Sequence, residues 1–263
     1  MPSLIPAVAL TLAFLVSLIP FGRLRFLTCE FVGRRRQAVG AFCLVGILSV
    51  AVFQPALSPE TLASVEPAQI WFPGLFAGHF LLAGFLIVWW RLGRRRSLAG
   101  FLHLDHTSIG DLWLGSRVGV AGWCVTIVTM VAVGLAVMPL SAGDTTQEAP
   151  AFMIWLADLP LDHKLLIIIA AMTVEEAFFR AFLQSRLGWI PSTLIFAVAH
   201  ASYGMPIMLV GVFVISLVIG WLFRRTGRLL PCIVAHGVFD AIQLLVVIPL
   251  AVELAARGGW VVA

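Results

Sequence analysis

Eight long apolar segments constrain what this chain can fold into more than any other feature of its sequence. They cover roughly residues 3–20, 37–57, 71–91, 116–140, 162–187, 191–204, 205–223 and 229–252. A helix needs about 20 apolar residues to cross a bilayer, so the short segment 191–204 either crosses half of it or forms a hairpin with the next segment. Charged residues make up 11% of the 263 residues, whereas a soluble domain carries roughly 25%. We therefore predict an all-α fold, a polytopic transmembrane helix bundle with about eight spans.

Charged residues segregate between the two sides of this predicted alternation of spans. One side carries Arg23, Arg25, Arg34, Arg35, Arg36, Arg91, Arg94, Arg95, Arg96, Arg117, Arg186, Arg224, Arg225 and Arg228. The other side carries Glu60, Glu66, Asp144, Glu148, Asp158 and Asp162, with Lys164 and Arg257 as its only basic residues. Because excess Lys and Arg mark the cytoplasmic face, we expect a bacterial inner or plasma membrane protein with both termini outside. Membrane lipid is the expected partner of the basic loops, and the net charge of +4 requires no nucleic acid.

Ionisable residues inside the apolar segments are concentrated in the second half of the chain. Glu175, His200, His236 and Asp240 lie about 18, 14, 10 and 16 Å from the cytoplasmic ends of their predicted spans, at 1.5 Å per residue. Ionisable side chains at that depth are costly and usually functional. Since independent structural residues have no reason to share a depth, we predict that these four meet in one polar cavity. His79, in the first half, is interpreted instead as a hydrogen-bonding residue between helices.

Spacing along the helices sorts these residues into pairs. Glu176 and Arg180 are four residues apart, so they can form an ion pair that lowers the cost of both in lipid. Glu175 is rotated by about 100° from Glu176, which leaves its carboxylate to face the cavity. His236 and Asp240 are also four residues apart and share a helix face.

This set of side chains suits the activation of water. A carboxylate in apolar surroundings is a stronger base than in water, and Glu175 with His200 can hold and deprotonate one water molecule. His236 and Asp240 would then lie on the side of the oxyanion, where an N–H donor is stabilising. The same four residues are also possible ligands of a divalent metal such as zinc, although the His-Glu-x-x-His signature is absent. The sequence leaves both forms of water activation open.

Three motifs stand in order on successive predicted helices: Glu-Glu-x-x-x-Arg at 175–180, Phe-x-x-x-His at 196–200 and His-x-x-x-Asp at 236–240. This pattern resembles the CAAX-protease and bacteriocin-processing (CPBP) family of intramembrane proteases, also called Abi proteins. The resemblance covers roughly residues 116–252. It implies a helix bundle with a conical cavity open to the cytoplasm and the membrane, in which a glutamate and a histidine activate water.

The resemblance also implies a role for each motif residue. Glu175, His200, His236 and Asp240 would be catalytic, and Glu176 and Arg180 would support the first motif. Eukaryotic relatives carry asparagine at the last position, and an ionised aspartate cannot donate a hydrogen bond. Asp240 would therefore stay protonated, orient His236 or bind a metal.

On this interpretation the chain is one membrane domain in two parts. Residues 1–115 are predicted to hold three N-terminal transmembrane helices and a basic cytoplasmic loop, and residues 116–263 a CPBP-like catalytic helix bundle. The expected function is an intramembrane endopeptidase that cuts a membrane-associated peptide or lipidated protein near its C-terminus or its membrane-proximal part. A non-catalytic scaffold or immunity protein is one alternative. A proton-coupled transporter is the other, because intramembrane Glu, His and Asp residues also relay protons.

Overall fold

The computed structural model describes residues 3–58, 64, 66–93, 97–137 and 151–257, and these residues form helices joined by short turns, without a strand. The helices are α1 (Leu4–Ser17), α2 (Phe26–Glu30), α3 (Arg34–Leu48), η1 (Ser49–Phe53), α4 (Gln54–Ala56), η3 (Pro67–Gln69), η4 (Phe72–Phe76), α5 (Ala77–Leu92), α6 (Leu98–Phe101), α7 (Ile109–Val137), α8 (Ala151–Asp158), α9 (Leu161–Ala170), η6 (Ala171–Glu175), η7 (Ala177–Gln184), α10 (Ser185–Leu187), α11 (Trp189–Ala199), η8 (Ala201–Tyr203), α12 (Pro206–Thr226), α13 (Leu230–Ile242), η9 (Gln243–Val247) and α14 (Ile248–Ala256). The predicted all-α membrane bundle is confirmed. The chain is an integral, multi-pass membrane protein.

Within the described residues, five helices are both long and apolar enough to cross a membrane, rather than eight. They are Arg34–Ala56, Phe72–Leu92, Ile109–Val137, Pro206–Thr226 and Leu230–Ala256. Three predicted spans differ from these for separate reasons. α1 has 14 residues and α11 has 11, which is too short for a full crossing. The run from α9 to α10 is long enough but carries charged side chains in its interior.

Part of the predicted topology falls outside the described residues. This applies to Glu60, Arg94, Arg95, Arg96, Asp144, Glu148 and the last residues of the predicted span 116–140. The orientation of the termini therefore stays a prediction.

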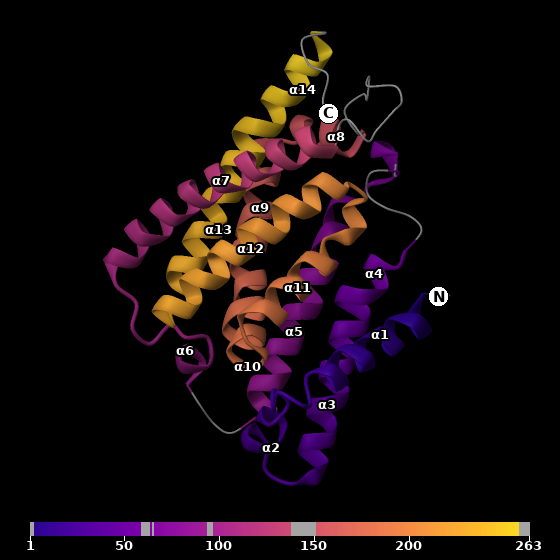
Figure 1. Cartoon of the computed structure of the whole chain (residues 1–263), viewed down its shortest axis with the longest axis vertical. Helices are drawn as coiled ribbons and strands as arrows, with labels where there is room; N and C mark the ends of the chain where they lie inside the picture. Colours follow the sequence, from indigo (N-terminus) through magenta and orange to yellow (C-terminus); the bar gives the residue numbers. More distant parts are fainter. Residues whose placement is uncertain (1–2, 59–63, 65, 94–96, 138–150, 258–263) are drawn as a thin grey trace.

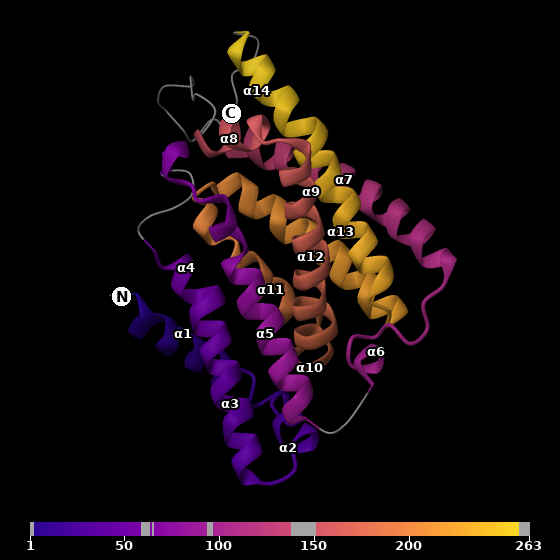
Figure 2. The same cartoon turned by 180° about the vertical axis from the view of Figure 1, so that it is seen from behind.

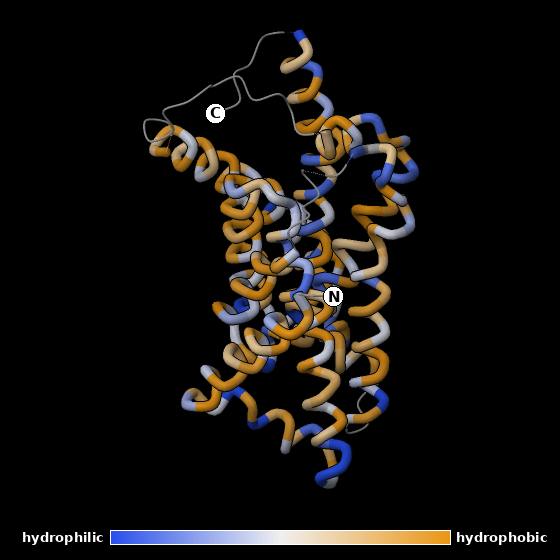
Figure 3. The backbone as a smooth tube through the Cα atoms, turned by 90° about the vertical axis from the view of Figure 1, so that its right-hand side faces the viewer, coloured by the Kyte–Doolittle hydropathy of each residue, from blue (hydrophilic) through white to orange (hydrophobic). Residues whose placement is uncertain are grey.

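The run Leu161–Leu187, here called the central helix, lies between two groups of helices. In Figures 1 and 2, α1, α3, α4 and α5 lie on one side of it, and α7 and α13 lie on the other. Figure 3 shows a mostly hydrophobic tube between hydrophilic segments at the two ends of the long axis. The central helix can therefore contact side chains from both halves of the chain.

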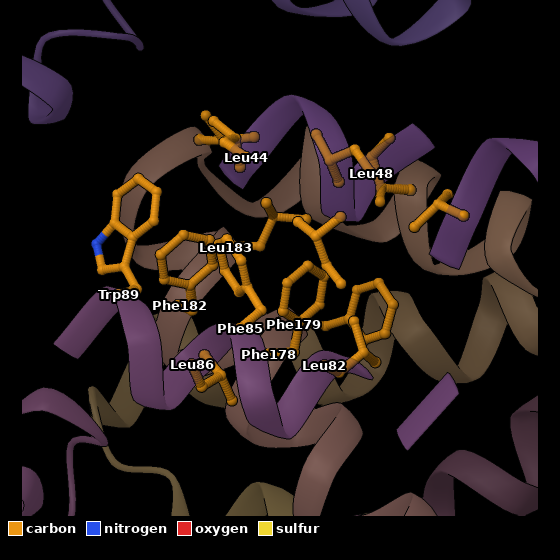
Figure 4. Close-up of a cluster of buried hydrophobic side chains, with 14 of the residues drawn as sticks. Leu44, Leu48, Leu82, Phe85, Leu86, Trp89, Phe178, Phe179, Phe182 and Leu183 are labelled. Carbon is orange, nitrogen blue, oxygen red and sulfur yellow. The ribbon is translucent and has the colours of Figure 1, made fainter. Parts of the chain in front are cut away.

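Aromatic packing fixes the central helix against α5. Phe178 and Phe182 contact Phe85 edge-on, with ring centroids 5.7 and 4.9 Å apart. Trp89 packs on Phe182 at 4.9 Å, and Figure 4 shows these rings in one cluster with leucines of α3. Residues 178–184 of η7 are all buried. Helices in a bilayer are held together by van der Waals packing, and aromatic pairs in edge-on geometry add about 0.5–1.5 kcal/mol each, so this cluster holds the orientation of the neighbouring acid pair.

Glycines bring α7 into close contact with α13. A Cβ atom added at Gly115 or at Gly119 would lie 2.7 Å from the carbonyl oxygen of Pro231 or of Ala235, respectively. Small residues spaced by four are typical of helix pairs that approach closely in membranes. α7 makes its most extensive contacts with α13 and then with α12. This packing positions the helix that carries His236 and Asp240.

The central helix is not α-helical throughout. η6 and η7 are π-helical, with hydrogen bonds to the fifth residue rather than the fourth. Such segments are rare and frequently occur at functional sites. The acid pair Glu175 and Glu176 lies at the junction of the two segments.

α7 begins at Ile109, so the predicted boundary at residue 115 falls inside this helix. α5, from the first part, also packs on η6 and η7. The division of the chain into two parts stays a prediction.

Candidate active site

A fully buried ion pair lies at the centre of the site. Arg180 Nε donates to Glu176 Oε2 over 3.0 Å, and both side chains are 0% exposed. A second guanidinium nitrogen donates to Ser216 Oγ of α12 over 3.1 Å. The guanidinium also lies 5.2 Å from the ring centroid of Phe196. A buried charge is retained only when it is paired and hydrogen-bonded, and this arrangement meets that condition for Glu176.

Glu175 points away from this pair and towards two histidines. Its Oε1 lies 3.1 Å from His79 Nε2, and its Oε2 lies 3.7 Å from His200 Nε2. His200 Nδ1 donates to the carbonyl oxygen of Phe196 over 2.8 Å, so in the neutral ring Nε2 is an acceptor. Two acceptor atoms therefore face each other across a distance longer than a hydrogen bond. A water molecule that donates to both atoms satisfies this geometry.

His236 lies between two carboxylates. Its Nδ1 is 2.9 Å from Glu176 Oε1, and its Nε2 is 3.4 Å from Asp240 Oδ2. Glu176 is paired with Arg180 and can only accept, so His236 Nδ1 carries the proton. The contact with Glu176 turns Nε2 towards Asp240. Glu176 thus joins the ion pair to the second histidine, which the spacing of the motifs did not predict.

Solvent exposure separates these residues into two layers. The side chains of Glu175 and His200 are each 13% exposed, and that of Asp240 is 19% exposed. Glu176 and Arg180, by contrast, are fully buried. The side that could meet a substrate is therefore the side of Glu175, His200 and Asp240.

His79 forms the hydrogen bond between helices that the sequence predicted, but its partner is Glu175, so it belongs to this cluster, outside which the sequence interpretation had placed it. It lies on α5, which packs against the central helix, and its side chain is 20% exposed. The counting used for the other residues places it about 18 Å from the end of the predicted span 71–91, the same depth as Glu175. That agreement in depth was a signal in the sequence, whereas no nearby motif marks the residue.

The arrangement does not fit a zinc ion. No group of three or more His, Cys, Asp or Glu side chains is placed to hold one metal ion in the described part of the chain. We derive no step through a metal, and the zinc hypothesis stays a prediction.

Two cavities lie away from this cluster. They have volumes of about 420 and 330 Å³ and share Phe26, Glu30, Phe101 and Arg186 among their lining residues. Glu30 accepts from Arg186 and from Trp89 Nε1, each over 2.9 Å. These contacts tie α2 to α5 and α10, and none of the motif residues lines either cavity.

Comparison with known proteins identifies the segment that carries the cluster. Residues 158–242 match the family described as type II CAAX prenyl endopeptidase Rce1-like. This segment of the chain is similar to the CAAX prenyl endopeptidases of that family. The match is shorter than the resemblance at 116–252, but it includes all seven motif residues. His79 lies outside it.

A relative among curated proteins supports the same segment. The uncharacterized protein YpbD of Bacillus subtilis (strain 168) is 30% identical over 83 residues. The aligned residues make up 31% of this chain and 44% of YpbD, so the chain spans less than half the length of this curated relative. No solved structure matches the chain.

Proposed function

We propose that this chain is an intramembrane endopeptidase that hydrolyses a peptide bond with water activated by Glu175 and His200. The observation that carries the proposal is the pair of facing acceptors, Glu175 Oε2 and His200 Nε2, 3.7 Å apart. A water molecule held between them is oriented with both of its protons engaged and a lone pair exposed. Positioning of this kind lowers the barrier to attack on a carbonyl carbon.

The proposed reaction begins with transfer of a proton from water to Glu175. The oxygen of the water attacks the carbonyl carbon of the scissile bond, and negative charge develops on the carbonyl oxygen. Glu175 then returns the proton to the leaving nitrogen as the C–N bond breaks, which completes the hydrolysis. The side chain of Glu175 is 13% exposed, whereas its Oε2 atom is buried, so in this proposal water reaches Oε2 by a small movement of the neighbouring side chains.

His236 supplies stabilisation of the oxyanion in this proposal. Its Nδ1–H is held by Glu176 Oε1 over 2.9 Å, which fixes the ring, and its Nε2 lies on the side of Asp240. Because Nδ1 already carries a proton, an N–H at Nε2 requires the positively charged ring, which in this proposal is stabilised by the flanking carboxylates of Glu176 and Asp240. That N–H is the donor to the oxyanion on the partly exposed side of Asp240. Of the three roles that the sequence left open for Asp240, this proposal assigns it the orientation of the His236 ring. Donors of this kind contribute about 10²–10³-fold to the rate.

The proposed substrates are peptides or lipidated proteins cut near their C-terminus or at the edge of the membrane. The support for this class is the membrane bundle together with the match at residues 158–242 to the Rce1-like family of CAAX prenyl endopeptidases. A cluster inside a bilayer meets only substrates that are themselves held at the membrane.

The test compares matched variants of purified protein in proteoliposomes. Wild-type protein is incubated with a farnesylated CAAX peptide and with its unprenylated form, and products are measured by mass spectrometry. Glu175→Gln and His200→Ala are expected to lower cleavage by at least about 100-fold. The controls are Glu253→Gln, an exposed acid paired with Arg257, and His163→Ala on α9.

The two control variants are expected to cleave like the wild type. Folding of each variant is checked by size-exclusion chromatography and by thermal unfolding. A wild-type protein that is folded but cleaves neither peptide would favour the scaffold interpretation. If Glu175→Gln still cleaves the peptide at the wild-type rate, the assignment of Glu175 as the general base is refuted.

A further inference from the structure

We propose that His79 is a positioning residue that holds Glu175 in its reactive orientation. The observation is the 3.1 Å contact between His79 Nε2 and Glu175 Oε1. This proposal rests on the proposed function, and it adds a residue from the first half of the chain that lies outside the match at 158–242.

The two oxygens of Glu175 have different environments. Oε1 takes the hydrogen bond from His79, whereas Oε2 is buried without a hydrogen-bond partner among the described residues and faces His200. A carboxylate with one oxygen bound to a fixed donor cannot rotate freely about its last torsion. The bond from His79 therefore determines which oxygen is presented to the water.

The orientation of His79 is itself fixed by the fold. A carboxylate only accepts, so Nε2 carries the proton in this contact. The residue lies in the first turn of α5, and its ring packs beside Phe76 with centroids 6.0 Å apart. Further along the same helix, Phe85 and Trp89 pack on the central helix. The aromatic cluster thus sets the distance between α5 and Glu175.

A structural role and a positioning role make different predictions for kinetics. Loss of a merely structural contact lowers the amount of folded enzyme and leaves the properties of each folded molecule unchanged. Loss of positioning lowers kcat and leaves KM nearly unchanged, because His79 binds the base rather than the substrate. A donor returned to the same place restores kcat.

The experiment measures kcat and KM for His79→Leu and His79→Gln, with His163→Leu as the control. His79→Leu is expected to lower kcat between about 10-fold and 100-fold, with KM changed by less than about twofold. Glutamine carries an N–H donor near the ε position, so His79→Gln is expected to recover most of kcat. Equal losses for the two His79 variants, or unchanged kcat in His79→Leu, would overturn the proposal.

A second measurement reads the contact without cleavage. Protein with ¹⁵N-labelled histidine rings is compared in detergent micelles as wild type and as Glu175→Gln, with the His79 signals assigned from His79→Gln. The Nε2 signal of His79 is expected to shift in Glu175→Gln and to stay in place in Glu253→Gln. If the wild type cleaves no substrate but the shift occurs, the proposed function fails and the hydrogen bond to Glu175 stands. If the chemical shift of His79 Nε2 is the same in the wild type and in Glu175→Gln, the positioning role is refuted.

Discussion

Replacement of Arg180 by methionine removes the charge that compensates Glu176 at the centre of the bundle. Arg180 is 0% exposed and donates to Glu176 Oε2 and to Ser216 Oγ. Methionine keeps much of the volume and of the contact with Phe196 but carries no donor. In Arg180→Met, Glu176 keeps only the hydrogen bond from His236.

The magnitude follows from the burial of the pair. Removing one partner of a buried ion pair costs about 3–5 kcal/mol, because the remaining charge is left without compensation. Replacing both partners is much less costly. The double variant Glu176→Gln with Arg180→Met is therefore expected to lose at least about 1 kcal/mol less than the single variant. Glutamine still offers an oxygen to His236 Nδ1.

The assay is equilibrium unfolding in mixed micelles with increasing sodium dodecyl sulfate, followed by fluorescence of the nine tryptophans. The matched control is Arg35→Met, an exposed arginine near the start of α3. Exposed substitutions usually stay within about 0.5 kcal/mol. A loss below about 1 kcal/mol in Arg180→Met, or a double variant as unstable as the single one, would refute the argument from burial.

Three further predictions test other parts of the structure. Gly119→Ala is expected to lower the free energy of unfolding by about 1–3 kcal/mol, because its Cβ would lie 2.7 Å from Ala235 O. The control is Gly134→Ala on the same helix, where an added Cβ has no atom within 4 Å, and this variant is expected to be neutral or stabilising. Asp240→Asn is expected to keep cleavage within about threefold, since it can still orient His236, and Asp240→Ala to lower it at least about tenfold; equal rates for both would contradict this role. Dialysis against a chelator is expected to leave cleavage unchanged, and a loss that zinc restores would show that a metal takes part.

The sequence predicted the helical framework well because hydropathy and charge decide it. The predicted span 71–91 corresponds to the helix Phe72–Leu92, and 205–223 to Pro206–Thr226. The sequence predicted helix length less well where a short helix is held in place by packing against neighbouring helices. α11 ends at Ala199 after 11 residues, and Gly188, with φ of 97°, separates it from the central helix. Lengths of that kind depend on tertiary packing and not on local composition.

The site divides in the same way. The i to i+4 spacing of Glu176 with Arg180, and of His236 with Asp240, is local information, and both contacts are present. The link from His236 to Glu176 depends on how α13 meets the central helix, and nothing in the spacing encodes it. No local spacing marks His79 either, although its predicted depth equals that of Glu175. It is separated by 96 positions from the acid it contacts.

Assembly of the cluster has a consequence for how the protein is made. His79 comes from α5, while Asp240 comes from α13 near the end of the chain. During synthesis, the early helices enter the bilayer while the segment that completes the cluster is still unmade. A nascent or truncated chain therefore lacks part of the cluster around Glu175. The complete cluster forms only when α13 packs against α7.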